Sequence, residues 1–345
     1  MSKVGDLPTG GMRLVPPRQA LPTTLLPPEP APSFPPPVSR PTSPPRPISE
    51  QRAVSPETAP QSAARHRTWR RRRLLLVMVL TLVVSQLAAV GLVASLRWVN
   101  PPTTAFLLED GLASRRSNST AEPPIREWVD IDAISRNLLV AIIGHEDQAF
   151  SGRGGGVDWQ QFRKRVNAWR AHQPDPSGST IDQQLAKNLF LWHEQDPVRK
   201  GVEAYLATLL AQELPHRRIL ELYANLVEFG PGIWGACAAS WYYFGVPPSD
   251  LALDQSARLV GLLPRPKTFS RAAGGGVAHG PTDVVAWSQA HIARQVADVH
   301  GLSSLTTIGV TGLASDGGGA RRCSAPPPDV HARLARGAQG TGRQA

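Results

Sequence analysis

A row of polar side chains near the middle of the chain joins a helix start to groups that could bind an anion. Residues 178–188 read Gly-Ser-Thr-Ile-Asp-Gln-Gln-Leu-Ala-Lys-Asn. We expect Ser179 to cap the helix that follows, with Asp182 completing a capping box. Gln183 and Lys187 are four residues apart, so their amide and ammonium groups would share a face near the positive helix terminus. The pattern predicts a phosphate-binding corner, although an ordinary capped amphipathic helix with solvated glutamines has the same spacing.

A carboxylate on an apolar helical stripe is the second candidate for chemistry. Ile134, Leu138 and Ile142 repeat with a helical period, and the next step of four residues reaches Glu146. An acid on a buried face is either paired in a salt bridge or adapted for proton transfer, because burial disfavours its charged form. Both interpretations remain open for Glu146, whereas Asp147 points away from the stripe and is predicted to be structural.

A second carboxylate lies on the buried stripe of the helix predicted over 198–214. Glu203 aligns with Ala207 and Leu210, and Arg199 lies one turn before it. A structural ion pair between Arg199 and Glu203 would explain this spacing without any catalytic role.

The segments around these candidate site residues are predicted to differ in rigidity. Residues 151–156 include four glycines and are expected to form a mobile loop at the edge of a cleft. The helix predicted over 158–171 carries four basic residues, a pattern typical of a solvated face. They are Arg163, Lys164, Arg165 and Arg170. No segment of 128–270 alternates as a strand does, so the compact domain is predicted to be all-α.

An apolar run of 23 residues, 74–96, follows four consecutive arginines and contains no charged side chain. This length spans a bilayer, and its start after residue 73 argues against a cleaved signal peptide. Many basic residues precede the run and only Arg97 follows it directly, so the N-terminus is predicted to stay in the cytoplasm. Residues 69–98 are therefore predicted to be a transmembrane helix with its flanks.

Composition divides the rest of the chain. Residues 1–68 contain 17 of the 34 prolines and are predicted to be a disordered cytoplasmic tail. Residues 99–127 are predicted to be an extended periplasmic connector, and 128–270 the compact domain. Residues 271–345 are predicted to be largely disordered, with order at most as far as 283–299.

Charge and cysteine content limit the partners. The formal charge is +10, but residues 74–270 contain 18 Lys and Arg against 19 Asp and Glu. A nucleic-acid-binding domain would concentrate positive charge on itself, so no nucleic-acid partner is predicted. Two cysteines support neither a disulfide framework nor a metal cage. Because Cys323 falls in the predicted tail, we expect Cys237 and Cys323 to be free thiols, although one pair could form.

Four segments resemble the successive motifs of the family 51 peptidoglycan glycosyltransferases. They are Glu-Asp-Gln-Ala-Phe at 146–150, the segment 178–188, Arg-Lys-Gly-Val-Glu at 199–203 and Arg-Ile-Leu-Glu-Leu-Tyr-Ala-Asn at 218–225. The resemblance covers about 99–270 and, with no penicillin-binding domain, is to the monofunctional members. It implies a lysozyme-like, two-lobed helical domain on the periplasmic face of the bacterial cytoplasmic (inner) membrane.

The resemblance also implies a reaction. Lipid II would be added to a lipid-linked glycan chain through a β-1,4 bond, with inversion, as undecaprenyl pyrophosphate leaves. Glu146 matches the family's general base and Glu203 its second glutamate. The positions that match or neighbour the pyrophosphate-binding groups are Ser179, Gln183, Lys187, Arg199 and Lys200. A divalent cation (Mg²⁺ or Mn²⁺) with Glu203 as a ligand could share this task, no organic cofactor is implied, and cell-wall synthesis proteins are conceivable partners.

Two departures from the family pattern keep other functions open. Arg153 stands where the family usually has His, and Gln195 stands where many members carry a phosphate-binding arginine. The alternatives are a lysozyme-like glycan hydrolase and a catalytically impaired membrane-anchored scaffold. A hydrolase has no use for a cationic pyrophosphate site or a bilayer anchor, and a decayed enzyme need not keep both glutamates. Glycan synthesis is therefore the preferred hypothesis.

Overall fold

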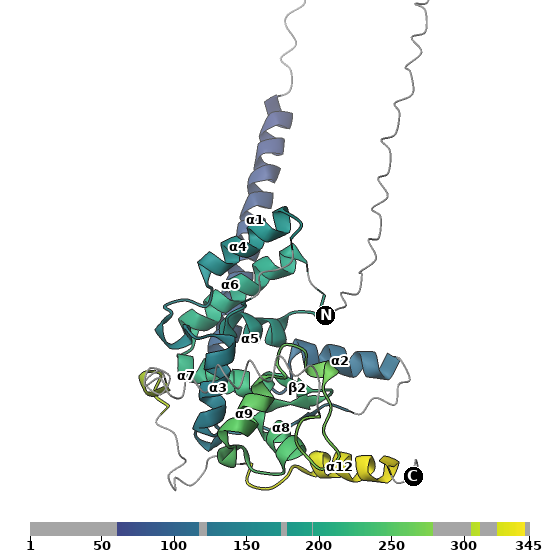
Figure 1. Ribbon diagram of the computed structural model, residues 1–345. Coiled ribbons are helices and arrows are strands. Elements are labelled where there is room, and N and C mark those ends of the chain that lie inside the picture. The colour runs from purple at the N-terminus through teal and green to yellow at the C-terminus, as the bar shows by residue number, and fades with distance from the viewer. Residues whose placement is uncertain are drawn as a thin grey trace, which may run out of the picture. The chain divides into compact units, whose positions relative to one another are not determined.

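The computed structural model (Figure 1) describes a defined part of the chain, namely residues 61–116, 123–173, 178–194, 196–278, 305–310 and 323–341. The predictions for residues 1–60, for Gln195 and for 283–299 lie outside these residues. The chain divides into two compact units, Met1–Arg65 and His66–Ala345, and the contacts given below all belong to the second.

Helix α1 (Gln61–Ser95) begins eight residues before the predicted transmembrane segment. Within it, Trp69–Ser95 is long and apolar enough to cross a membrane, and it is the one such helix in the described part of the chain. Its leucines and valines are largely exposed, whereas the core helix of a soluble protein would bury them. Length, composition and exposure thus all fit a membrane-spanning helix.

The compact domain is tied to the end of α1. Arg218 donates from Nε to the carbonyl of Leu96 at 2.7 Å, and from Nη2 to the carbonyl of Val99 at 3.1 Å and to Asn100 Oδ1 at 2.6 Å. Its guanidinium also pairs with Glu221 at 3.1 Å. The residues just after α1 are therefore fixed to helix α7 (His216–Leu226) rather than forming a free linker.

The expectation of an extended connector is wrong in its middle, where helix α2 (Ala105–Arg116) forms and packs against α5 (Ile181–Phe190). Thr104 accepts a hydrogen bond from the amide of Leu107 at 3.1 Å, so a side-chain cap starts the helix just beyond the proline pair. Phe106 is buried against the domain. The connector thus contributes a wall to the folded body.

Seven α-helices build the domain between residues 136 and 260: α3 (Arg136–Glu146), α4 (Trp159–Arg170), α5 (Ile181–Phe190), α6 (Pro197–Glu213), α7 (His216–Leu226), α8 (Gly235–Phe244) and α9 (Leu253–Val260). Short 3₁₀ turns link them at Ile131–Ala133, Phe150–Gly152, Pro248–Asp250 and Pro266–Thr268. Helix α5 packs against both α6 and α7, α3 against α9, and α7 against α8. Leu138, Leu185 and Leu210 are fully buried where these helices meet.

Three very short strands form a sheet in the order β1-β3-β2. β1 (Ile125–Arg126) runs parallel to β3 (Ile233–Trp234), and β2 (Glu228–Gly230) runs antiparallel to β3 with an irregular register. Strands of two or three residues are too short to show alternation in the sequence. The prediction of an all-α domain is confirmed, with this small sheet as an addition.

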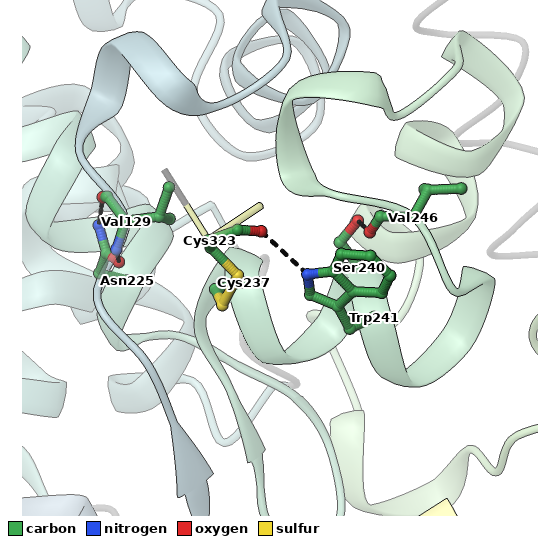
Figure 2. Close-up of a disulfide and its surroundings, with 7 residues drawn as sticks. All are labelled: Val129, Asn225, Cys237, Ser240, Trp241, Val246 and Cys323. Carbon is green, nitrogen blue, oxygen red and sulfur yellow. Dashed lines mark hydrogen bonds between the residues drawn. A yellow bond between two sulfur atoms is a disulfide. The ribbon is translucent and has the colours of Figure 1, made fainter. Parts of the chain in front are cut away.

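The C-terminal segment corrects two expectations. Cys237 on α8 forms a disulfide with Cys323 rather than remaining a free thiol, and helix α12 (Pro328–Thr341) packs against α8. Figure 2 shows the indole of Trp241 donating to the carbonyl of Cys323, at 3.0 Å. Arg333 on α12 donates to the carbonyls of Pro231 at 3.1 Å and Pro123 at 2.5 Å. Order therefore continues beyond residue 299, because this segment docks on the domain.

Candidate active site

Helix α5 begins one residue later than predicted, and this shift changes the role of each polar group at its start. Thr180 is the cap: its hydroxyl accepts from the amide of Gln183 at 3.1 Å, and Gln183 Oε1 accepts from the amide of Thr180 at 3.2 Å. The predicted box of Ser179 with Asp182 is therefore wrong. Gln183, predicted to bind pyrophosphate, is buried in the cap, whereas Ser179 keeps its hydroxyl for other contacts.

Glu146 occupies the C-terminal end of α3, and its carboxylate is held by two polar neighbours. Gln184 donates from Nε2 to Oε2 at 2.6 Å, and His145 Nδ1 lies 2.7 Å from Oε1. Gln184 is itself oriented by the hydroxyl of Tyr223, which donates to its Oε1 at 3.0 Å. Burial raises the pKa of Tyr223 well above its usual value, so the phenol stays a donor. Neither partner of Glu146 is a lysine or arginine, an arrangement that suits proton transfer better than a structural ion pair.

Glu203 on α6 has the opposite environment. Its side chain is 1% exposed, Arg199 Nη1 lies 3.2 Å from Oε2, and Lys200 Nζ contacts Oε1. The ion pair predicted between Arg199 and Glu203 is thus confirmed, and Lys200 adds a second cation. Both oxygens of Glu203 are occupied by positive groups.

Two cations converge on the hydroxyl of Ser179. Lys200 Nζ donates to Ser179 Oγ at 2.9 Å, and Arg165 Nη1 donates to the same atom at 3.0 Å. Arg165 comes from α4, whose basic residues the sequence assigned to a solvated face. The direction of that face depends on how α4 packs, which periodicity alone does not reveal.

Lys187 lies within electrostatic reach of both glutamates. Burial lowers the pKa of its ammonium group, Arg199 and Arg165 act in the same direction, and Glu203 and Glu146 oppose the shift. Four cations (Arg165, Lys187, Arg199 and Lys200) thus lie around Ser179 and Glu203. This excess of positive charge suits a group with more than one negative charge, such as a pyrophosphate.

Asp147 connects the end of α3 to the start of α5. It accepts two hydrogen bonds from Arg153, at 2.5 and 2.6 Å, and one from the amide of Ile181 at 3.2 Å. The arginine that replaces the family's usual histidine therefore fixes a buried carboxylate. The structural role predicted for Asp147 fits these contacts.

The glycine-rich loop is more tightly held than its composition suggested. His216 Nε2 lies 3.1 Å from the carbonyl of Arg153, and the hydroxyl of Thr180 donates to the carbonyl of Gly156 at 2.7 Å. A Cβ on Gly156 would lie 1.9 Å from the carbonyl oxygen of Ala207, so only glycine fits there. The expectation of a mobile loop is replaced by a loop anchored at both ends.

A pocket of about 380 Å³ adjoins these groups. Gln184, Lys187 and Asn188 of α5 line one side. The remaining walls come from other parts of the chain and comprise Phe106, His193, Val227, Glu228, Trp234 and the run from Leu263 to Thr268. Because Gln184 also holds Glu146, the pocket and the candidate base share this residue.

The residues around Glu203 do not form a suitable divalent-cation site. Mg²⁺ and Mn²⁺ prefer several carboxylate or carbonyl oxygens, but both oxygens of Glu203 face cationic side chains. In the part of the chain that the structure describes, no group of three His, Cys, Asp or Glu side chains could hold a metal. We derive no step of the reaction through a metal ion.

Comparison with known proteins agrees with this geometry. A family model described as Transglycosylase matches residues 114–286, half of the 345-residue chain. The chain belongs to the transglycosylase family. This membership accounts for its lysozyme-like helical fold and makes it a glycosyltransferase. Helix α12 and Cys323 lie beyond the matched region.

Curated relatives of this transglycosylase carry a more specific name. The chain is 38% identical over 201 residues to the biosynthetic peptidoglycan transglycosylase of Shewanella amazonensis, covering 58% of this chain and 77% of the relative. It is 39% identical to that of Burkholderia thailandensis, covering 62% and 80%. It is 40% identical to that of Vibrio parahaemolyticus, covering 56% and 83%.

Proposed function

We propose that the protein is a peptidoglycan transglycosylase that polymerises lipid II into β-1,4-linked glycan strands. The names of the relatives support peptidoglycan as the product. One observation carries the proposal: the carboxylate of Glu146, held by Gln184 and His145 rather than by a lysine or arginine, lies within electrostatic reach of Lys187 in the cation-rich corner. A base for a sugar hydroxyl and a site for a pyrophosphate are the two groups that this reaction requires.

In the proposed reaction, the 4-hydroxyl of the acceptor sugar attacks the anomeric carbon of the donor. Glu146 takes the hydroxyl proton as the new C–O bond forms. The bond from the anomeric carbon to the undecaprenyl pyrophosphate breaks with inversion, and its electron pair leaves with the pyrophosphate. The cations near Ser179 stabilise the negative charge that develops there. Gln184 keeps the carboxylate of Glu146 oriented, and Tyr223 orients Gln184.

The same proposal places the catalytic domain on the periplasmic side of the inner membrane, with the N-terminus in the cytoplasm. Four arginines at 70–73 precede the apolar part of α1, in agreement with the positive-inside rule. The disulfide between Cys237 and Cys323 gives independent support, because disulfides persist in oxidising compartments and are rare in the cytosol.

An exposed apolar face on α6 supports access to a lipid-linked substrate. Val198, Val202 and Tyr205 follow one another at helical spacing, and Val198 is 73% exposed. The hydroxyl of Tyr205 donates to Gln86 of α1, so this face lies beside the proposed membrane span. The lipid-linked chain and the membrane are thus the proposed partners, and cell-wall synthesis proteins are further candidates.

The test is polymerisation of labelled lipid II by the purified full chain in detergent, with and without moenomycin, the family's inhibitor. We expect glycan polymer that moenomycin abolishes. Glu146→Gln should keep the fold and lose about 10²–10⁴-fold in rate, because an amide cannot accept the proton. Asp254→Asn, at an exposed position on α9, is the matched control. Cleavage of finished glycan strands without any polymerisation would favour the hydrolase instead.

A further inference from the structure

Glu228 is a buried carboxylate that the proposed reaction does not use. It lies on β2 in the wall of the 380 Å³ pocket that begins at Gln184 and Lys187. The residue is 7% exposed, and its Oε1 accepts from the amide of Gly232 at 3.1 Å. That hydrogen bond fixes the side chain across the turn between β2 and β3. One carboxylate oxygen is therefore committed to the turn, and the group as a whole borders the pocket.

Glu228 is not neutralised by an ion pair in the described part of the chain. The nearest charges acting on it are Lys267 and Asp110, which pair with each other at 2.8 Å. Lys187, Arg265 and His193 are the other charged or titratable groups lining the pocket. Among these, His193 lies 2.6 Å from Glu109. A buried acid without a partner of its own usually has a functional reason to be retained.

The protonation of Glu228 changes near neutral pH. Burial raises its pKa to about 7, Asp110 acts in the same direction, and the amide of Gly232 and the charge of Lys267 oppose the shift. The group can therefore donate or accept a hydrogen bond under physiological conditions, as a ligand rich in hydroxyl and amide groups would require.

The other walls of the pocket favour the same class of ligand. Phe106 and His193 stack at a centroid distance of 3.8 Å, and Trp234 and two prolines add further apolar surface. Flat apolar walls with a few polar groups are usual in small-molecule sites, and a volume of about 380 Å³ lies in their normal range. Gln184 lines this pocket and also donates to Glu146, so a ligand in the pocket would lie one residue away from the candidate base.

We propose that Glu228 is a substrate-binding residue that hydrogen-bonds a saccharide unit of the lipid-linked substrate in this pocket. The inference rests on the proposed function and adds a residue to its site. Its role is to position the glycan relative to Glu146, not to exchange a proton with the reacting hydroxyl.

Glu228→Gln is the discriminating variant, because its amide oxygen can still accept from Gly232 while its NH2 group presents only donors to the pocket, so the acceptor and the ionisation are both lost. We expect its KM for lipid II to rise about tenfold, the loss of one good hydrogen bond, with a smaller change in kcat. The pH profile of KM should contain an ionisation near pH 7 in the parent and lack it in the variant. Asp254→Asn should match the parent in both.

Binding measured without turnover separates this inference from the proposed function. Fluorescent lipid II is titrated into Glu146→Gln and into the Glu146→Gln, Glu228→Gln double variant, and we expect about tenfold weaker binding to the double variant. Equal binding, with an unchanged pH profile in the single variant, would overturn the role of Glu228 and leave the proposed function intact. A parent that neither binds nor polymerises lipid II would overturn both. If Glu228→Gln lowers the thermal midpoint, Glu228→Asp takes its place in the same comparison. This variant keeps the carboxylate but holds it one methylene farther from the pocket.

Discussion

Asp182 on α5 gives the protein a destabilising buried charge at neutral pH. The residue is 3% exposed, and its Oδ1 has no hydrogen-bond partner among the described residues. Burial raises its pKa from 3.8 to about 7, and the charge of Asp147 acts in the same direction. The backbone amide of Asp182 itself and the guanidinium of Arg153 oppose the shift but do not cancel it.

The sign of the effect follows from proton binding. Between pH 3.8 and about 7 the folded state keeps a proton on Asp182 that the unfolded state has released. The free energy of unfolding therefore falls as the pH rises through this interval, and the loss is complete above about pH 7. With about 1.4 kcal/mol for each pKa unit, the total penalty is on the order of 4 kcal/mol.

Asp182→Asn should remove this penalty, because the amide has the same shape and carries no charge. We expect the variant to be more stable than the parent by about 3–4 kcal/mol at pH 8, a rise in Tm of roughly 10 °C, and to differ little from it near pH 4. The measurement is thermal unfolding of the full chain in detergent, followed by circular dichroism across pH 4 to 8.5.

Glu228 also has a raised pKa, so it contributes to the pH dependence of the free energy of unfolding as well. It remains in both proteins and adds the same downward slope to each curve, which leaves the difference between them to Asp182. Equal stability of parent and variant at pH 8 would mean that the Asp182 carboxylate finds water or a partner in solution. The description of its Oδ1 as buried and without a hydrogen-bond partner among the described residues would then be wrong.

Four further substitutions test contacts at the site and elsewhere in the domain. Gln184→Ala should lower kcat about 10²-fold, because it releases the carboxylate of Glu146 that Gln184 orients. Tyr223→Phe should lower kcat only a few-fold, because Tyr223 acts on Glu146 through Gln184. Equal effects of the two substitutions in steady-state polymerisation would contradict this order of contacts. Arg153→Ala should cost about 3–5 kcal/mol of stability in urea unfolding, because it leaves Asp147 buried and unpaired, and a loss under 1 kcal/mol would contradict this. Cys323→Ser should cost about 4–5 kcal/mol for a closed loop of 86 residues, and adding reductant should not destabilise that variant further.

Periodicity in the sequence was sufficient to find the two glutamates. The apolar stripe of α3 leads to Glu146 and that of α6 leads to Glu203, and helix geometry alone fixes which face each residue occupies. The pairing of Glu203 with Arg199 follows from the same spacing. These are local properties, and local properties are what a single sequence can predict.

The cap of α5 was misplaced because its register is decided by a distant contact. Ser179 and Thr180 are equally good caps by residue type, but the hydroxyl of Thr180 also donates to the carbonyl of Gly156. That contact holds Thr180 at the entry to the helix. Gln184, rather than Gln183, then faces Glu146, and nothing in the local sequence distinguishes the two glutamines.

The remaining differences involve segments far apart in the chain. Arg165 reaches Ser179 from another helix, and Cys323 pairs with Cys237 across 86 residues. Composition suggested that Cys323 lies in a flexible tail, yet Val330 is fully buried once α12 docks on α8. Tertiary packing, which a composition argument does not include, decides both cases.

Helix α5 explains why the base, the cationic corner and the pocket can work together. Ser179 precedes its first turn, Gln184 holds Glu146 from its middle, and Lys187 lines the pocket one turn further on. A helix rises 1.5 Å per residue, so Gln184 and Lys187 lie about 4.5 Å apart along its axis, and Ser179 is fixed just before its first turn. Its packing against α6 and α7 brings the partners of each group, Lys200 from one helix and Tyr223 from the other. The donor sugar and its pyrophosphate are joined covalently. Because α5 is a single rigid helix that positions groups for both, it keeps the attacking hydroxyl and the leaving group at a constant separation.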